Sequence, residues 1–191
     1  MCKEAAQAVT DGANYLVLTD RQVDASMAVI PSVLAVSAVH HYLISVKKRV
    51  QTALVVETGE MREVMHAALL LGFGASAVNP YMAFAVLENL VAKQSVQLNY
   101  ETAEKNYVKS LCKGLLKVLS KMGISTIRSY RGAKLFEAVG LSEDLAANYF
   151  GGISSKVGGI GLKEIAEDAV RMHEAGYEHE LSAVLEHKGI Y

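Results

Sequence analysis

The stretch that decides the fold runs from Thr52 to Tyr81 and reads TALVVETGEMREVMHAALLLGFGASAVNPY. It opens with Ala53–Val56, a short apolar run rich in β-branched residues, which predicts a buried strand. From Met61 the apolar residues recur every three or four positions, as on a helix that packs against a sheet. Two glycines end this helix, and a second strand is expected at Ala75–Val78. The pattern therefore predicts one parallel βαβ unit with a right-handed crossover.

Polar residues stand where the predicted strands end. Two short segments follow the strands of the βαβ unit, Glu57-Thr58-Gly59-Glu60 and Asn79-Pro80-Tyr81. Asp20 and Arg21 follow a further predicted strand, Tyr15–Leu18. In parallel α/β folds the chemistry collects at the carboxyl ends of the strands, so these residues are the first candidates for a site. Asp20 and Arg21 could bind an anion, but an ion pair within the chain is the simpler interpretation.

Strands and helices alternate along the rest of the chain. Helices are expected at Lys3–Val9, Ser32–Val46, Met82–Ala92, Tyr107–Met122, Ala133–Val139 and Leu162–Glu174, and a fourth strand at Ser125–Tyr130. The polar segment Lys93–Glu104 reads as an insertion or hinge. The predicted fold class is α/β, with a mostly parallel β-sheet flanked by helices, either partial-barrel-like or open doubly wound. We expect residues 1–191 to form a single α/β domain, with residues 179–191 as a tail that docks or frays.

Composition restricts the function classes. The chain has 191 residues, of which 51% are hydrophobic, and this suits one well-filled globular domain. A formal net charge of -1 gives no electrostatic case for binding nucleic acid. Charged residues interrupt every apolar run, so no membrane span is predicted, and the first residues lack the apolar core of a signal peptide. We therefore expect a cytoplasmic chain.

Cysteines and paired histidines offer no clear metal site. Cys2 and Cys112 lack CxxC spacing, which argues against a disulfide framework, a zinc site or an iron–sulfur cluster held by this chain alone. Cys112 lies among apolar residues, so a buried, inert thiol is expected. His40 and His41 point about 100° apart on a helix and cannot chelate one ion together. One packed and one surface histidine is the expected arrangement.

The densest polar group is the start of the helix in the βαβ unit: Glu57, Glu60, Arg62, Glu63 and His66. On a helix Arg62 and His66 are four residues apart and share a face. Carboxylates near the positive end of the helix dipole account for most of this group. The alternative is a metal site built on Glu57, Glu63 and His66, although one histidine with nearby carboxylates is a thin ligand set.

A glycine-rich run, Gly151–Gly161, precedes the last predicted helix. Backbone N–H groups at such a place can form an anion nest, and Ser154, Ser155 and Lys156 would add donors. The run lacks the order of a P-loop or of a dinucleotide-binding loop, so a flexible connector is the simpler interpretation. With Glu57-Thr58-Gly59 it would make a stand-alone phosphate- or nucleotide-binding α/β module. No serine stands in a nucleophile elbow, and the residues alone do not indicate a catalyst.

The chain resembles the central domain of the glutamate synthase large subunit, in its C-terminal portion. The similar blocks follow one another in a consistent order between Val9 and Glu164. They are Thr19-Asp20-Arg21 with the strand before it, Ile30–His41, Val55–Tyr81, Gly114–Thr126, Ser129–Ala133, Phe136–Leu141 and Gly158–Gly161. Two positions depart from the family pattern. Met65-His66 stands where the family usually has paired histidines, and Lys156 replaces an arginine and loses its bidentate geometry.

The resemblance implies a function for the whole enzyme and a supporting role for this chain. Glutamate synthases transfer the amide nitrogen of glutamine to 2-oxoglutarate with the help of a reduced electron donor, and form two glutamates. In that family an N-terminal glutaminase domain releases ammonia, and a later barrel domain carries FMN and an iron–sulfur cluster. The expected partners are therefore the glutaminase and FMN-binding domains of the same enzyme, and a homo-oligomer is compatible with this. No catalytic, cofactor-binding or metal-binding residue is carried over, because those residues of the family lie outside the matched blocks. We expect a non-catalytic domain without turnover of its own.

Overall fold

The computed structural model describes residues 1–177, and the predicted tail at 179–191 lies outside this range. The first half contains α1 (Cys2–Thr10), β1 (Tyr15–Thr19), α2 (Ser32–Ser45), η1 (Arg49–Gln51), β2 (Ala53–Glu57), α3 (Val64–Gly72) and β3 (Ala77–Asn79). The second half contains α4 (Tyr81–Ala92), α5 (Tyr100–Lys121), α6 (Ile127–Tyr130), β4 (Ala138–Leu141), α7 (Glu143–Tyr149), β5 (Ser155–Ile160) and α8 (Leu162–Tyr177). None of the described helices is both long and apolar enough to cross a membrane.

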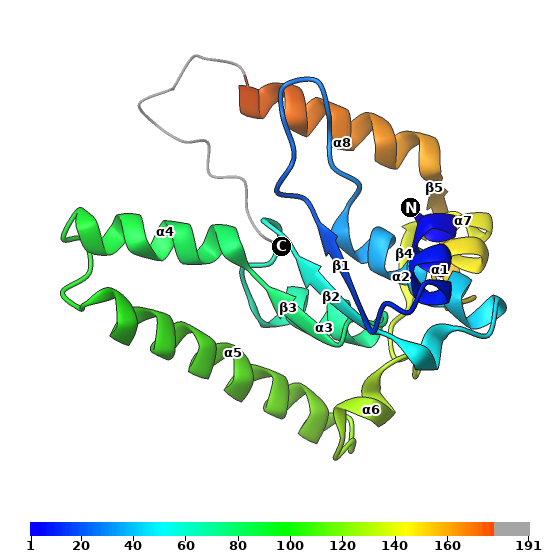
Figure 1. Cartoon of the computed structure of the whole chain (residues 1–191), viewed down its shortest axis with the longest axis horizontal. Coiled ribbons are helices and arrows are strands. Elements are labelled where there is room, and N and C mark those ends of the chain that lie inside the picture. Colours follow the sequence, from blue (N-terminus) through cyan, green and yellow to red (C-terminus); the bar gives the residue numbers. More distant parts are fainter. Residues whose placement is uncertain (178–191) are drawn as a thin grey trace.

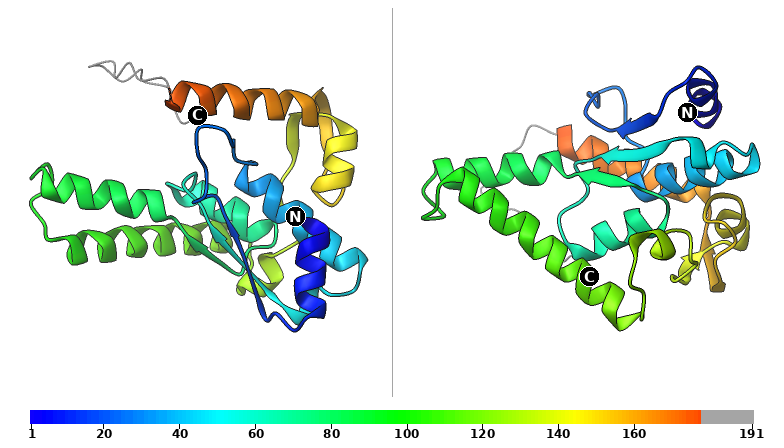
Figure 2. Two further views of the ribbon diagram at one scale, coloured as in Figure 1. Left: turned by 45° about the horizontal axis from the view of Figure 1, so that its top comes forward. Right: turned by 60° about the horizontal axis from the view of Figure 1, so that its bottom comes forward.

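The strands form two small parallel sheets. β1, β2 and β3 lie side by side in this order, with Thr19 opposite Glu57 and Glu57 opposite Asn79 at their carboxyl ends. β4 and β5 form the second, two-stranded sheet. In Figures 1 and 2, α4 and α5 form a hairpin that projects from the three-stranded sheet, and α8 lies on another side of the molecule. The predicted α/β class with parallel strands flanked by helices is confirmed, and the described strands do not close a barrel.

The region after α5 differs from the sequence prediction. The strand expected at Ser125–Tyr130 is wrong, because Thr126 caps the short helix α6 by accepting a hydrogen bond from the Ser129 N–H at 3.3 Å. The helix expected at Ala133–Val139 is also wrong. Lys134 has a φ of 52°, which breaks a helix, and the segment ends in β4, where it pairs with β5.

Helix α5 begins seven residues earlier than the apolar pattern indicated, at Tyr100 instead of Tyr107. Asn99 provides the reason, since its side chain accepts a hydrogen bond from the Thr102 N–H at 2.8 Å and so caps the helix. The last five residues of the polar segment Lys93–Glu104 therefore belong to α5, and residues 93–99 connect α4 with α5.

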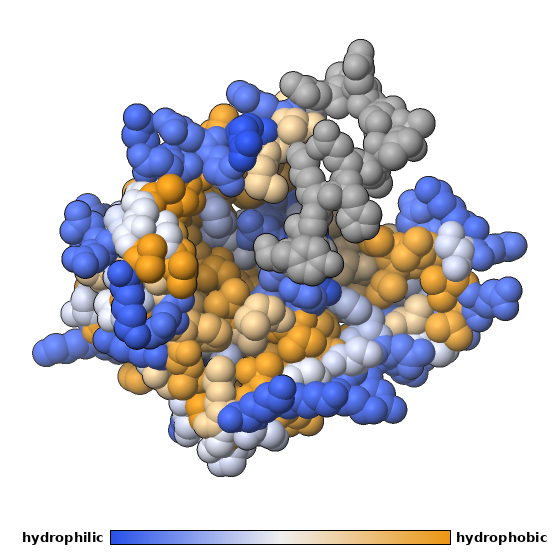
Figure 3. Space-filling view, turned by 180° about the vertical axis from the view of Figure 1, so that it is seen from behind, coloured by the Kyte–Doolittle hydropathy of each residue, from blue (hydrophilic) through white to orange (hydrophobic). Residues whose placement is uncertain are grey.

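One face of the three-stranded sheet lacks a helical cover among the described residues. On β1, Leu16 is buried beneath α2, whereas Tyr15 and Val17 on the other face are 73% and 57% exposed. Helix α4 is rich in apolar residues and none of them is buried. Figure 3 shows apolar residues gathered in the middle of one face of the molecule, with polar residues around them. Parallel sheets normally have both faces covered, so these exposed apolar residues form the candidate contact surface of the described part of the chain.

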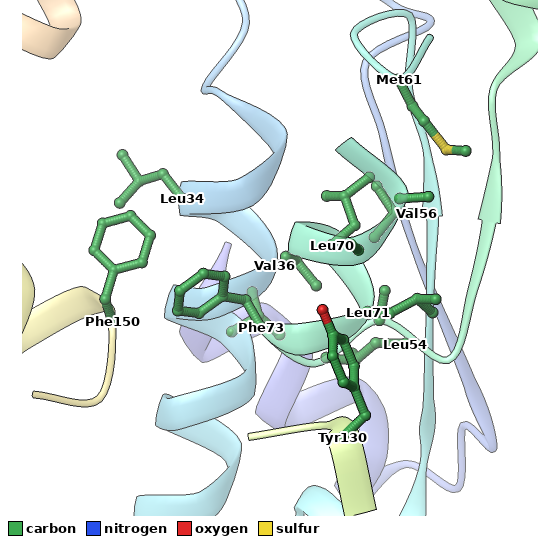
Figure 4. Packing of buried hydrophobic residues seen from close by; sticks show 14 of the residues in the cluster. Leu34, Val36, Leu54, Val56, Met61, Leu70, Leu71, Phe73, Tyr130 and Phe150 are labelled. Atoms are coloured by element: carbon green, nitrogen blue, oxygen red, sulfur yellow. The ribbon is translucent and has the colours of Figure 1, made fainter. Parts of the chain in front are cut away.

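The core lies between the sheet and the helices α2, α3 and α6. Leu54 and Val56 of β2 point toward α3, where Leu70 and Leu71 meet them (Figure 4). Phe73 continues this core toward α7, because its ring lies 5.3 Å from the Phe150 ring. One contiguous cluster thus connects the two small sheets.

Helices α3 and α5 approach closely at Gly114, and this contact gives a testable prediction. A Cβ at Gly114 would overlap the methyl groups of Val64, a β-branched residue with little rotamer freedom in a helix. We expect Gly114→Ala to lower the free energy of unfolding by about 1–3 kcal/mol, measured by urea denaturation. The control is Gly176→Ala in α8, where a Cβ would meet open space. Equal losses in both variants would contradict the packing argument.

Candidate functional site at the strand ends

Asp20 organises the carboxyl end of the three-stranded sheet. Its carboxylate accepts a hydrogen bond from the Thr58 hydroxyl at 2.7 Å and another from the Gly59 N–H at 2.9 Å. The Thr58 hydroxyl in turn accepts from the Glu60 N–H at 3.1 Å. Thr58 is 1% exposed, so this chain of hydrogen bonds fixes the turn after β2 in a place without water.

Glu57 joins the ends of all three strands. Its carboxylate pairs with the Arg21 guanidinium at 2.7 Å and accepts from the Thr19 hydroxyl at 2.8 Å and the Asn79 amide at 3.1 Å. Hydrogen bonds from Arg21, and then from Thr19, lower the pKa of the Glu57 carboxyl below its usual value. The ion pair predicted as the simpler interpretation of Arg21 is thus present, with Glu57 as its partner.

Tyr81 closes the network from the start of α4. The Arg21 guanidinium lies 4.1 Å from the centre of the Tyr81 ring, in a cation–π contact. Burial and the negative charge of Asp20 raise the pKa of Tyr81 to about 12, so its hydroxyl remains protonated. The strand-end residues Asp20, Arg21 and Glu57 that the sequence singled out therefore do lie together, and their side chains bind neighbouring residues of the network.

The side chains of the second predicted polar group, at the start of α3, make separate contacts. Helix α3 begins at Val64, so Arg62 precedes it, and the predicted shared helical face with His66 is wrong. Instead, the Arg62 N–H donates to His66 Nδ1 at 3.2 Å, and Glu63 Oε1 lies 3.7 Å from His66 Nε2. Glu60 accepts from the Ser32 N–H at 2.6 Å. Across residues 1–177 no three acidic, histidine or cysteine side chains converge as a metal site would require.

An apolar cavity of about 530 Å³ lies beside the strand-end network. Its walls come from α1, β1, α2 and the loop after β1, with residues such as Ala5, Leu16, Met27, Ile30 and Ala35. Asp20, Glu57 and Thr58 stand at its edge, but their polar atoms are already engaged. The cavity is therefore suited to apolar side chains more than to a charged ligand.

His40 and His41 have different environments. His40 is 6% exposed, as predicted for the packed member of the pair, and burial lowers its pKa to about 4, with the positive charge of Arg49 acting in the same direction. His41 is half-buried instead of lying at the surface, and its Nδ1 lies 2.8 Å from the Ser37 carbonyl oxygen. No motif singled out Arg49, whose Nε donates to His40 Nδ1 at 2.8 Å.

The glycine-rich run is not a flexible connector. Most of it is β5, paired with β4, and the Ser155 hydroxyl donates to the Leu141 carbonyl oxygen at 2.6 Å. Lys156 forms an exposed ion pair with Glu137 at 3.0 Å. At the end of the run the Gly161 N–H donates to the Glu164 carboxylate at 2.8 Å. The run thus belongs to a different sheet from Glu57-Thr58-Gly59, and its last N–H already has an anionic partner.

The two cysteines lie on different helices. Cys2 is half-buried in α1, whereas Cys112 is exposed on α5, so the predicted burial of Cys112 is wrong. Its helical neighbours Val108 and Leu116 are exposed as well, so this face of α5 is not covered by the described residues. Two separate thiols cannot supply the four thiolate ligands that an iron–sulfur cluster requires.

The sequence of the chain matches a family model and several known proteins. Residues 1–142 match the family model described as Glutamate synthase central domain. The chain is 45% identical, over 97% of its length, to the glutamate synthase (NADPH) large chain of Bacillus subtilis. It is 44% identical over 93% of its length to the glutamate synthase (NADH) of Schizosaccharomyces pombe, and 38% identical over 93% to the ferredoxin-dependent glutamate synthase of Pyropia yezoensis. The chain spans only 8% to 12% of these relatives' own length.

Proposed function

The chain belongs to the glutamate synthase central-domain family, and from this premise we propose that it is a non-catalytic coupling domain. In the longer enzyme it would pack against the glutaminase and FMN-binding domains and help to line the path of ammonia between them. The whole enzyme would convert glutamine and 2-oxoglutarate into two glutamates, in the cytoplasm, with FMN and an iron–sulfur cluster held by other domains.

The uncovered face of the three-stranded sheet carries this proposal. Tyr15 and Val17 are exposed on one face of the parallel sheet. Helix α4 is also rich in apolar residues, and none of its residues is buried. Exposure of such apolar surfaces to water is unfavourable, and packing against another domain removes this cost. The chain corresponds to only 12% of the Bacillus subtilis relative. Adjoining domains of a longer polypeptide are therefore the candidates that would cover these surfaces.

The closed hydrogen-bond network at the strand ends supports the absence of turnover. Glu57 and Asp20 are the best placed acids, but the carboxylate oxygens of each accept hydrogen bonds from several donors. A general base needs a free lone pair directed at a substrate, and a nucleophile needs an adjacent base. The network is therefore suited to fixing the geometry of the sheet edge against a neighbour.

The isolated chain tests the absence of catalysis. We expect purified chain to release no ammonia or glutamate from glutamine and to show no visible absorbance of a bound flavin. The positive control is the longer enzyme under the same assay. Glutamine hydrolysis or bound flavin in a clean preparation would overturn the assignment.

Coupling is tested in the longer enzyme by changing the uncovered sheet face. We expect Val17→Lys to weaken domain packing, so that less glutamate forms for each glutamine hydrolysed and more ammonia escapes into solution. The matched control is Leu116→Lys, which lies among Lys113 and Lys117 on the exposed face of α5. An unchanged ratio of the two products in Val17→Lys would contradict the role of this face.

A further inference from the structure

Three residues with cationic or imidazole side chains, His40, Arg49 and Arg131, come from segments that meet at the edge of the sheet opposite the strand-end network. Arg49 lies in η1, just before β2, and His40 faces it from α2. Arg131 follows α6, and its loop is held beside α3 because the Gly132 N–H donates to the Gly72 carbonyl oxygen at 2.8 Å. A Cβ at Gly132 would lie 3.6 Å from His40 Nε2, so the Arg131–Gly132 backbone approaches the His40 ring.

Two nitrogen donors of this cluster, His40 Nε2 and Arg131 Nε, have no hydrogen-bond acceptor among the described residues. Arg49 donates through Nε to His40 Nδ1, through Nη1 to the Thr52 carbonyl oxygen and through Nη2 to the Gly74 carbonyl oxygen, each at 2.8 Å. Because His40 Nδ1 accepts, the proton of the neutral ring stands on Nε2, which faces the Arg131–Gly132 loop. Arg131 Nε is buried and has no partner among the described residues.

The cluster carries positive charge without a compensating carboxylate. In the part of the chain that the structure describes, no carboxylate lies within 4.0 Å of a side-chain nitrogen of Arg49, Arg128 or Arg131. Burial lowers the pKa of both Arg49 and Arg131 from its ordinary value, and the positive charge of Arg131 acts in the same direction on Arg49, as that of Arg128 does on Arg131. Half-buried guanidinium groups with unused donors are costly unless an anion accompanies them.

We propose that His40, Arg49 and Arg131 form an oxyanion-binding site that accepts a carboxylate or phosphate group. The Arg131 guanidinium would supply a planar pair of donors, His40 Nε2–H a further donor, and Arg49 an additional positive charge that is fixed in place by its own three hydrogen bonds. This site lies at the other edge of the sheet from the strand-end network and does not depend on the coupling function.

Thermal unfolding of the purified chain tests the site. At equal ionic strength and pH 7, we expect phosphate in place of chloride to raise the Tm by about 3 °C more in the unmodified chain than in Arg131→Gln. Acetate in a parallel series should act in the same direction, and the larger rise identifies the preferred oxyanion. The matched control is Arg128→Gln, which removes a neighbouring cation and should keep the response. Equal rises in the unmodified chain and in Arg131→Gln would overturn the proposal, because only a general salt effect would remain.

A second measurement covers the case in which Arg131→Gln does not fold. In a phosphate titration of the unmodified, isotope-labelled chain, we expect the amide signals of Gly132 and Gly74 to shift along a saturating curve. The amides of Gly158 in β5 and Gly176 in α8, where an added Cβ would meet open space, serve as internal controls. Shifts of the same size and shape at all four glycines would show that no localised site exists.

Discussion

Asp20→Ala should lower the free energy of unfolding by about 3 kcal/mol, since it removes the acceptor on which the strand-end network depends. The Thr58 hydroxyl and the Gly59 N–H both donate to this carboxylate. Thr58 is 1% exposed, so its hydroxyl cannot turn to water when the acceptor is lost. A buried donor left without a partner costs about 1–3 kcal/mol, and two such donors produce the expected effect.

Urea denaturation of Asp20→Ala and of a matched variant provides the measurement. Asp11→Ala is the control, because Asp11 accepts a side-chain hydrogen bond only from the exposed Gln7, at 2.8 Å. We expect the control to stay within about 0.5 kcal/mol of the unmodified chain. A loss of less than about 1 kcal/mol in Asp20→Ala would show that water replaces the carboxylate and that the turn after β2 is not sealed.

The first half of the fold follows from local patterns. The apolar run Ala53–Val56 and the helical spacing after Met61 are each properties of neighbouring residues, and the structure has β2 and α3 there. The parallel pairing of β1, β2 and β3 follows in turn, because crossover helices allow only that direction. Polar residues at the strand ends must then meet at one edge, as Glu57 and Asn79 do.

The second half depends on contacts between distant residues. Ser125–Tyr130 has the composition of a strand, but Tyr130 becomes 2% exposed by packing beside α3 and Phe136. Likewise β4 and β5 are short, irregular strands that exist through mutual pairing, which no local pattern reveals. The cluster of His40, Arg49 and Arg131 comes from three elements, so sequence spacing could not bring its members together.

The free energy of unfolding should fall by about 2–3 kcal/mol when the pH is lowered from about 6.5 to 4, and His40 should account for this loss. The His40 ring is buried beside the Arg49 guanidinium, and its pKa is lowered from 6.5 to about 4. In the unfolded chain the imidazole takes up a proton near its ordinary pKa, while in the folded chain it stays neutral. The unfolded state therefore binds more protons in this window, so the contribution of His40 is complete above pH 6.5 and disappears as the pH approaches 4.

His40→Asn separates this contribution from those of the other titrating groups. An asparagine side-chain oxygen can replace Nδ1 as the acceptor for the Arg49 Nε–H, but it cannot take up a proton. The variant should lose stability at pH 7 through the smaller side chain, yet its stability should change less between pH 7 and pH 4.5 than that of the unmodified chain. His66→Asn is the matched control for the loss of one imidazole elsewhere. If His40→Asn keeps the full pH dependence, the His40 ring takes up its proton at nearly the same pH in the folded and the unfolded chain, and burial beside Arg49 does not lower its pKa.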